Sequence, residues 1–422
     1  MPSNGSTPRF RLPTWASPSD SFTPRQRRIL LLIALASMSS AFVNTLFTQT
    51  VAYAADEFGI GNSGQGIGAA VVRWGIIICL PLVALADRHG RRPLMISMAW
   101  AAPIISAAGA LSPSFPFLVA TQTIGRPLGL TLDILIAVVA VEEMPRNARA
   151  YATGLLAVLS GAGAGIAVAS LPLADISTTS WRYIYLVTLV WLLVAVALMK
   201  WLPESQRFEQ HHEVNADVRA QARAALRHNI GRICTVVFLT NLYIATASIF
   251  QNRYLKDDRG YSAALVALFT VATSAPASIG LIVGGRIADE RGRRMLGATM
   301  VPVGAFLLAL SFNTSGTTMW IVAIAGGLAF GVSYPAMAVY RGELFPTTVR
   351  SMAGGLIMTS ALIGGSIGLI GGGQVLDGGV NYGTVMLWLV LGPVIASFIV
   401  WFRYPETAHK ELEEINPTDA LT

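Results

Sequence analysis

The hexapeptide Asp87-Arg88-His89-Gly90-Arg91-Arg92 occurs a second time in this chain, as Asp289-Glu290-Arg291-Gly292-Arg293-Arg294. The copies are 289 − 87 = 202 residues apart. Two further pairs share nearly that shift: Pro203-Glu204-Ser205 returns as Pro405-Glu406-Thr407, 202 residues later, and Glu143…Arg149 returns as Glu343…Arg350, 200 and 201 residues later. Three pairs in one register indicate a duplicated chain, whose function is expected where the halves meet.

The composition indicates a membrane protein. Of the 422 residues, 53% are hydrophobic and only 13% are charged, and the mean hydropathy is +0.57. Soluble domains carry about 25% charged residues, and a helix needs about 20 apolar residues to cross a bilayer. We predict an all-α membrane protein with twelve transmembrane helices in two pseudo-symmetric six-helix bundles. The spans lie near residues 29–51, 65–86, 93–113, 115–141, 150–174, 181–202, 231–251, 262–288, 295–313, 317–341, 351–376 and 381–403.

These spans divide the chain into five parts. They are a tail (1–28), a first bundle (29–202), a linker (203–230), a second bundle (231–403) and a second tail (404–422). Most Lys and Arg fall in the tails and loops on one side, so the positive-inside rule places both termini in the cytoplasm of a plasma-membrane protein. The net charge of +7 fits this bias and anionic lipid headgroups, and it does not indicate nucleic acid, because the basic residues are spread over many loops.

The linker is charged and is expected to be helical. Arg219, Arg223 and Arg227 recur at every fourth position, which places three cations on one helical face. Such a helix lies against the headgroups or caps the bundle; a solvated basic tether is the alternative that remains open.

The repeated hexapeptides are expected to form short loops that help to gate transport. Gly90 and Gly292 permit a tight turn with positive φ. Asp87 and Asp289 end their helices, where an arginine of a neighbouring helix can pair with them in one transport state and separate in the other. A plain positive-inside loop is the alternative, which the matched copies disfavour. We assign to the gating loops Asp87, Arg88, Gly90, Arg91, Arg92, Glu143, Arg149, Glu204, Asp289, Arg291, Gly292, Arg293, Arg294, Glu343, Arg350 and Glu406.

These segments resemble the major facilitator superfamily. The matching residues are the two D-x-x-G-R-R loops, the Pro-Glu-Ser and Pro-Glu-Thr segments, Gly342-Glu343-Leu344-Phe345-Pro346…Arg350, and Gly125-Arg126 in span four. The resemblance covers nearly the whole chain and is nearest to the branch of sugar porters, organic-ion transporters and aromatic-acid/proton symporters. It implies two six-helix bundles around a central cavity, lined mainly by spans one, four, seven and ten, that rock between inward-open and outward-open states.

One position departs from this pattern. In the family a glycine stands four residues before the loop aspartate; Gly285 satisfies this in the second half, but Val83 occupies the place in the first. We expect the glycine-rich run of span eleven to compensate in packing against span two. Its Gly364, Gly368 and Gly372 form two overlapping G-x-x-x-G steps, which allow close backbone approach.

Three ionisable residues fall well inside spans: Arg73 in span two, and Arg126 and Asp133 in span four. A charge at the bilayer centre costs at least about 2.5–3.5 kcal/mol, so such residues normally face a cavity or a partner. Arg126 and Asp133 are two turns apart on one face, about 10.5 Å along the axis, which suits substrate or water between them. A structural link from either residue to another helix is the alternative, and Arg73 lies nearer the outer face, where its side chain can snorkel.

The resemblance also suggests roles for these charges. In the related branches an arginine at the position of Arg126 works with an acidic residue of span one in proton coupling. Span one has Asn44 there and no carboxylate in its apolar run, so Asp133 is the expected proton carrier. Two embedded arginines against one aspartate make the cavity positive, and the planar fork of Arg126 suits a carboxylate or phosphate. The sequence thus predicts an organic anion as cargo.

Span position suggests further residues for a partly polar ligand pocket. Each of them is equally interpretable as a helix-packing contact. They are Asn44 and Gln49 in span one, Asn241 and Tyr243 in span seven, and Tyr334 and Tyr340 in span ten.

The function predicted is secondary active transport of a small organic, anionic solute with proton coupling, by a monomer. Span seven reads Thr240-Asn241-Leu242-Tyr243 without the Gln-Gln pair of sugar porters, which argues against a sugar. Multidrug/proton antiport is the alternative, although Gly161…Gly165 lacks the proline and closing glycine pair of the antiporter motif. A membrane-bound sensor is disfavoured because no long cytoplasmic domain is visible. The sequence offers no nucleophile–histidine pair, metal cluster or phosphate loop, so we expect neither an enzyme nor a cofactor or metal site.

Overall fold

The computed structural model of the chain describes residues 22–144, 149–203, 216–345 and 350–408. Within these ranges every regular element is a helix, and 12 helical segments are long and apolar enough to cross a membrane, which confirms the predicted fold class. The first half contains α1 (Pro24–Glu57), α2 (Asn62–Trp74), α3 (Cys79–His89), α4 (Arg91–Ala107), α5 (Phe115–Glu143), α6 (Arg149–Ala169), α7 (Trp181–Val187) and α8 (Leu192–Trp201). The second half contains α9 (Ala216–Asp257), α10 (Ala263–Arg291), α11 (Arg293–Ser311), α12 (Gly316–Glu343), α13 (Arg350–Asp377) and α14 (Tyr382–Arg403).

Short 3-10 segments continue several spans of the first half. They are η2 (Gly75–Ile78) between α2 and α3, η3 (Ala108–Leu111) after α4, η5 (Leu171–Asp175) after α6, and η6 (Thr188–Trp191) between α7 and α8. The linker helix is not a separate element, because α9 begins at Ala216 and runs unbroken into span seven. The side chains of Arg219, Arg223 and Arg227 lie outside the described part of the chain.

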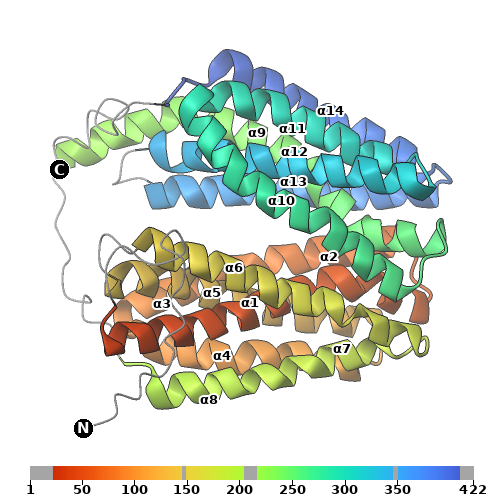
Figure 1. Ribbon diagram of the computed structural model, residues 1–422, viewed down its shortest axis with the longest axis horizontal. Coiled ribbons are helices and arrows are strands. Elements are labelled where there is room, and N and C mark those ends of the chain that lie inside the picture. Colours follow the sequence, from red (N-terminus) through yellow and green to blue (C-terminus); the bar gives the residue numbers. More distant parts are fainter. Residues whose placement is uncertain (1–21, 145–148, 204–215, 346–349, 409–422) are drawn as a thin grey trace, which may run out of the picture.

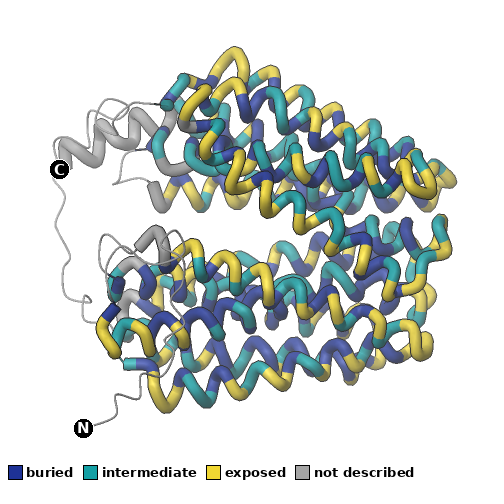
Figure 2. The backbone as a smooth tube through the Cα atoms, in the orientation of Figure 1, coloured by how far each residue is buried: buried dark blue, intermediate teal, exposed yellow. Residues whose placement is uncertain are grey.

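The two halves form two layers (Figure 1). They converge at one end and diverge toward the other, where α1 begins and α14 ends; we call these the far end and the termini end. Contacts between the halves join α2 to α13, α1 to α9, and η5 and α6 to α10. Buried residues line the inside of each half, and exposed residues run along its outside (Figure 2). Large apolar side chains such as Leu193 and Phe402 are among the exposed ones, as a surface in contact with lipid requires.

Glycines allow the helices to pack closely, but some of them contact a different helix from the one predicted. The expectation that Gly364, Gly368 and Gly372 pack against span two is wrong: a Cβ at Gly364 or Gly368 would lie 2.3 Å from a carbonyl oxygen of α9. Because these three residues recur at every fourth position, they share one face of α13, and α9 occupies that face. The contact with span two uses another face of α13, where Leu369 meets Gly66 of α2.

The two hexapeptide loops have the predicted turn. Gly90 (φ 93°) separates α3 from α4, and Gly292 (φ 103°) separates α10 from α11. A single residue therefore joins two long helices at each place, which only glycine adopts without strain.

Candidate transport site and gates

Arg126 lies on α5, in the membrane-spanning part of the first half. The residue is half-buried, and its buried Nε has no hydrogen-bond partner among the described residues. It takes part in none of the ion pairs found in the described ranges. Arg73 lies near the end of α2, which packs against α5. The site is therefore a pair of membrane-embedded cations that the described protein does not neutralise.

Proline and glycine bring these cations together. Pro127 cannot donate a backbone hydrogen bond, so the carbonyl of Thr123 is left without its helical donor. Gly75 of η2 packs directly on this carbonyl, where a Cβ would lie only 2.2 Å from the oxygen. The thiol of Cys79 donates to the Pro127 carbonyl at 3.2 Å. The break in span two thus fits the irregularity in α5. Arg73 precedes Gly75 by two residues and Arg126 directly precedes Pro127, so both arginines belong to this helix contact.

Asp133 lies two turns further along α5 and is half-buried. No hydrogen bond or ion pair joins it to another residue of the described ranges, so the alternative of a structural link from Arg126 or Asp133 to another helix gains no support there. The side chain of Asn44 of α1 lies against α5 between the two charges. A Cβ added to Gly129, which is located between Arg126 and Asp133, would be 3.0 Å from Asn44 Oδ1. The Asn44 amide donates to Ser40 at 3.3 Å, while its buried Oδ1 has no partner among the residues described.

Arg73 does not snorkel outward as the sequence allowed. Its Nη2 donates to Asn241 Oδ1 of α9 at 3.3 Å, across the junction of the halves. Gly365 of α13 leaves room for the guanidinium, since a Cβ there would lie 3.0 Å from Nη2. Two of the predicted site residues, far apart in sequence, are therefore in direct contact.

The second half contributes a cavity of about 370 Å³ lined by α9, α10, α11 and α12. Its wall carries polar groups, among them Gln251, Ser274 and Ser278, and the exposed ring of Tyr334. Tyr243 is 1% exposed and lines this cavity, and its buried hydroxyl has no hydrogen-bond partner among the described residues.

Tyr340 lies nearer the termini end. Its hydroxyl donates to the Pro405 carbonyl at 3.0 Å, and its ring packs edge-on against Tyr404. It also lines a smaller cavity of about 110 Å³, together with Asn241 and Tyr334.

At the termini end each half has an ion pair between its hexapeptide loop and a glutamate. Arg293 pairs with Glu343 in the second half, and Arg91 pairs with Glu142 in the first. The predicted equivalence of Glu143 with Glu343 is therefore wrong by one residue, because Glu142 is the structural counterpart of Glu343. The shift between these two glutamates is 343 − 142 = 201 residues, the same as that between Arg149 and Arg350. Glu143 also takes part in an ion pair, with Arg25 at 3.7 Å.

Glu406 of the Pro-Glu-Thr segment contacts the helix that follows the second hexapeptide glycine. Its carboxylate accepts from the backbone N–H groups of Arg293 and Arg294, at 2.9 and 3.1 Å, and so caps α11. Partial burial alone would raise the pKa of Glu406, but hydrogen bonds from the backbone of Arg293, Ala408, Arg294 and Thr407 outweigh it and lower the pKa.

The remaining loop residues divide into two groups. Arg92 donates to the carbonyls of Leu202 and Met199, whereas Arg291 and Arg294 have exposed side chains. The predicted pairing partners cannot be placed, because the following lie outside the described residues: Glu204 entirely, and the side chains of Asp87, Arg88, Arg149, Asp289 and Arg350.

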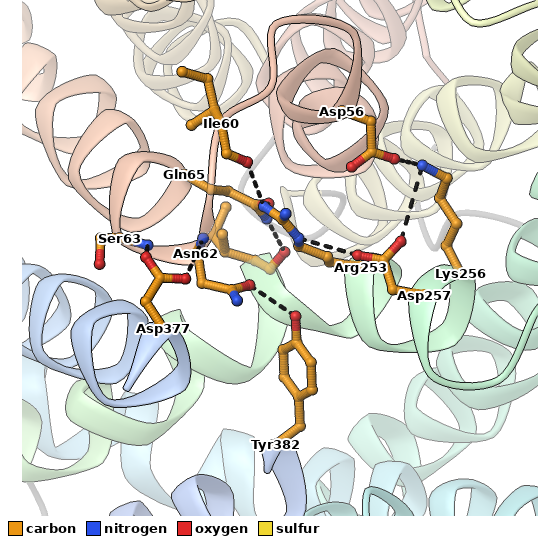
Figure 3. A network of polar contacts seen from close by, with 11 residues as sticks. Asp56, Ile60, Asn62, Ser63, Gln65, Arg253, Lys256, Asp257, Asp377 and Tyr382 are labelled. Atoms are coloured by element: carbon orange, nitrogen blue, oxygen red, sulfur yellow. Dashed lines mark hydrogen bonds and ion pairs between the residues drawn. The ribbon is translucent and has the colours of Figure 1, made fainter. Parts of the chain in front are cut away.

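The far end is closed by a polar network between the halves that the sequence did not predict (Figure 3). Arg253 of α9 donates to the Ile60 carbonyl and to Gln65 Oε1, each at 3.0 Å. Lys256 pairs with Asp56 of α1. Asn252 adds bonds to the carbonyl and the side chain of Gln49, at 2.9 and 3.0 Å. Gln49, predicted as a residue of the ligand pocket, therefore takes part in this network.

Comparison with known proteins decides the family. The sequence profile of the Major Facilitator Superfamily matches residues 31–251 and 233–420. The chain belongs to this superfamily. It is 25% identical over 336 residues to the cis,cis-muconate transport protein of Acinetobacter baylyi, covering 75% of this chain and 80% of the relative. It is likewise 25% identical over 356 residues to the shikimate transporter of Escherichia coli, covering 74% and 77%.

Solved structures share the fold. A bacterial homologue of the human lysosomal transporter Spinster, described as inward-facing and unoccupied, superposes with a TM-score of 0.76 at 15% identity, covering 94% of this chain and 99% of that one. The protein is thus a multi-pass membrane transporter of small organic solutes, not an enzyme.

Proposed function

We propose that this protein carries a small organic carboxylate across the plasma membrane together with protons, and that Arg126 binds the carboxylate. The observation that carries the proposal is Arg126 itself: a half-buried arginine at membrane depth with no acidic partner among the described residues. A charge there is costly unless something compensates it. An anionic cargo supplies the compensation, and a guanidinium binds carboxylates through two parallel hydrogen bonds.

The neighbouring residues support an anion over a cation or a sugar. Arg73 adds a second positive charge on the span that packs against α5 at this point. The muconate and shikimate transporters, to which the chain is similar, are named for carboxylates. The cavity of the second half offers an apolar wall with serines and the Tyr243 hydroxyl, which has no partner among the described residues. Such a wall suits a carbon skeleton bearing hydroxyl groups.

For the proton we infer a role of Asp133. It shares α5 with Arg126, is half-buried, and has no ion-pair partner in the described ranges. Protonation of Asp133 removes a negative charge near the cargo, so that proton and anion bind together more favourably than either alone. Asn44, whose amide faces the segment between the two charges, is a candidate to position water or substrate there.

We also infer the orientation. Arg25, Arg27 and Arg28 at the start of α1 and Arg403 at the end of α14 lie at the termini end, so the positive-inside rule places that end in the cytoplasm. The conformation described here, joined at the far end, then opens inward. We expect a monomer, because one chain contains both halves of the site.

Binding to the purified protein tests the cargo and the role of Arg126. Muconate and shikimate are expected to raise the thermal unfolding temperature of the wild type by mass action, whereas methyl shikimate, a neutral ester, and xylose are not. Arg126→Ala is expected to abolish the shift and Arg126→Lys to weaken it, while Arg286→Ala, which removes an exposed arginine of α10, leaves it unchanged. Full ligand-induced shifts in both Arg126 variants would overturn the proposal.

Proton coupling is tested separately in proteoliposomes. Asp133→Asn is expected to retain exchange of labelled substrate but to lose accumulation driven by a pH gradient. Unchanged accumulation in this variant would exclude Asp133 as the coupling residue, without bearing on Arg126.

A further inference from the structure

Two aspartates at the far end each cap a helix of the opposite half. Asp175, the last residue of η5 in the first half, accepts from the backbone N–H groups of Ala263 and Ala264 at the start of α10, at 2.7 and 3.0 Å. Each carboxylate oxygen accepts one bond. The first N–H groups of a helix have no partner within the helix and carry its positive dipole end, so a carboxylate satisfies both.

Asp377 repeats this arrangement in the reverse direction. It is the last residue of α13 in the second half, and it accepts from the N–H groups of Asn62 and Ser63 at the start of α2, at 2.9 and 2.8 Å. Figure 3 shows this contact beside the bond from the Tyr382 hydroxyl to Asn62 Oδ1. Again each oxygen takes one N–H group.

The internal repeat relates the two caps. The aspartates are 377 − 175 = 202 residues apart, which is the shift of the hexapeptide loops, and the capped helices begin 263 − 62 = 201 residues apart. The same cap therefore occurs twice at the far end. In one copy the first half supplies the aspartate and the second half the helix start, and in the other copy these roles are exchanged.

We propose that Asp175 and Asp377 form a reciprocal latch, which holds the far end closed and is released when the transporter opens there. All four bonds cross from one half to the other. Separation of the halves at this end must therefore break them together and leave both carboxylates and both helix starts to water. The latch acts on the conformational equilibrium and is independent of which cargo the protein carries.

The two caps are unequal in a way that sharpens the proposal. Ser262 also caps α10, because its side chain accepts from Leu265 N at 3.3 Å. At α2 the equivalent residue is Gly61, which has no side chain, and a Cβ there would lie 3.1 Å from Asp377 Oδ2. Asp377 is therefore the sole side-chain cap of α2 in the described structure, and its loss is expected to matter more than that of Asp175.

Distances between spin labels test the latch without substrate. Leu111→Cys and Thr317→Cys place labels on exposed far-end positions of the two halves, in a background with Cys79→Ser and Cys234→Ser. Pulsed electron paramagnetic resonance on the full-length protein is expected to show mainly the short distance of the closed end. Asp377→Asn is expected to raise the ratio of long-distance to short-distance populations about tenfold, because one amide oxygen cannot replace two carboxylate oxygens.

The other variants give the pattern required of a pair. Asp175→Asn is expected to act in the same direction but less, and the double variant more than either. Asp258→Asn removes an exposed far-end carboxylate that has no hydrogen bond or ion pair to the described residues of the other half, and it is expected to change nothing. Gly61→Ala, which crowds Asp377 while keeping its charge, is a second route to the same opening if Asp377→Asn does not fold.

The outcomes separate this proposal from that of carboxylate transport. The latch is overturned if the distance distribution of Asp377→Asn is the same as that of the wild type. If Asp377→Asn does not fold, the same result in Gly61→Ala overturns it. An equal response to Asp258→Asn also overturns it, because the effect is then general to far-end charge. Neither result depends on any ligand, so the assignment of Arg126 as the anion site stands or falls separately.

Discussion

Replacement of Gly66 by alanine is expected to drive the far end open. Gly66 lies on α2 against the backbone of α13: a Cβ would lie 2.3 Å from the Leu369 carbonyl oxygen, 3.1 Å from its carbonyl carbon and 3.5 Å from the ring of Phe250. Ordinary contact begins at 3.4 Å, so the overlap with the oxygen is 3.4 − 2.3 = 1.1 Å. Both Leu369 and Phe250 belong to the second half, so this clash exists only while the far end is closed.

The expected magnitude follows from this geometry. The obstructing atoms are backbone, so they do not move aside as a flexible side chain does, and overpacking of this kind costs about 1–3 kcal/mol. Because the cost falls on one conformation, the ratio of open to closed far ends is expected to rise about 5- to 150-fold. The gain in helix propensity from alanine is the same in both conformations and does not contribute to the ratio.

The assay is the distance between labels at Leu111→Cys and Thr317→Cys, without substrate. Gly371→Ala on α13, where nothing lies within 4 Å of a Cβ, is the matched control and is expected to leave the distribution unchanged. Gly331→Ala places a Cβ 2.1 Å from the Ala277 carbonyl within the second half, so it is expected to lower thermal stability without opening the far end. The reasoning is refuted if Gly66→Ala folds and keeps the wild-type distribution, or if Gly371→Ala opens the far end equally.

Three further predictions concern single carboxylates. Glu57 accepts from Trp181 Nε1 at 2.6 Å and pairs with Arg182 at 2.7 Å within the first half; Glu57→Gln is expected to cost about 2 kcal/mol, visible as a lower thermal unfolding temperature, with no change in the label distance. Glu142→Gln and Glu343→Gln are expected to destabilise their respective halves to a similar degree, whereas Glu143→Gln has the smaller effect; a larger effect of Glu143→Gln would contradict the equivalence of Glu142 with Glu343. The pKa of Glu406 is lowered from its ordinary value of 4.5, so its cap stabilises the protein fully above that value and is lost as the pH falls through the lowered pKa. The difference in unfolding temperature between wild type and Glu406→Gln is thus expected to be constant above about pH 5.5 and to shrink in more acidic buffer; a difference that does not depend on pH would contradict this.

Much of the fold was accessible from local properties of the chain. Apolar length predicted the twelve spans, and the positive φ of Gly90 and Gly292 followed from their place between two helices. The pairing of residues across helices was less accessible. Glu142 and Glu143 are adjacent glutamates, and only the direction of each side chain on α5 shows that Glu142 meets Arg91.

The candidate site shows the same division. Arg73, Arg126 and Asp133 were found because a charge in an apolar run is conspicuous, but the contact of Arg73 with Asn241 was not foreseen. Asp175 and Asp377 were missed although a signal was present, since they lie 202 residues apart like the hexapeptides. An aspartate at the end of a span is unremarkable in sequence, and only its position against a helix start of the other half gives it a role.

Composition and internal repetition determine that this protein spans a membrane twelve times and consists of two related halves, because burial in lipid and duplication leave their mark on each segment separately. Tertiary structure alone decides which faces of α13 meet α9 and α2, which glutamate pairs with each loop, and which carboxylates cap which helices. These pairings depend on how whole helices pack against one another, because the packing of two helices is determined by many close contacts of glycines and backbone along their length. No single stretch of the chain contains that information.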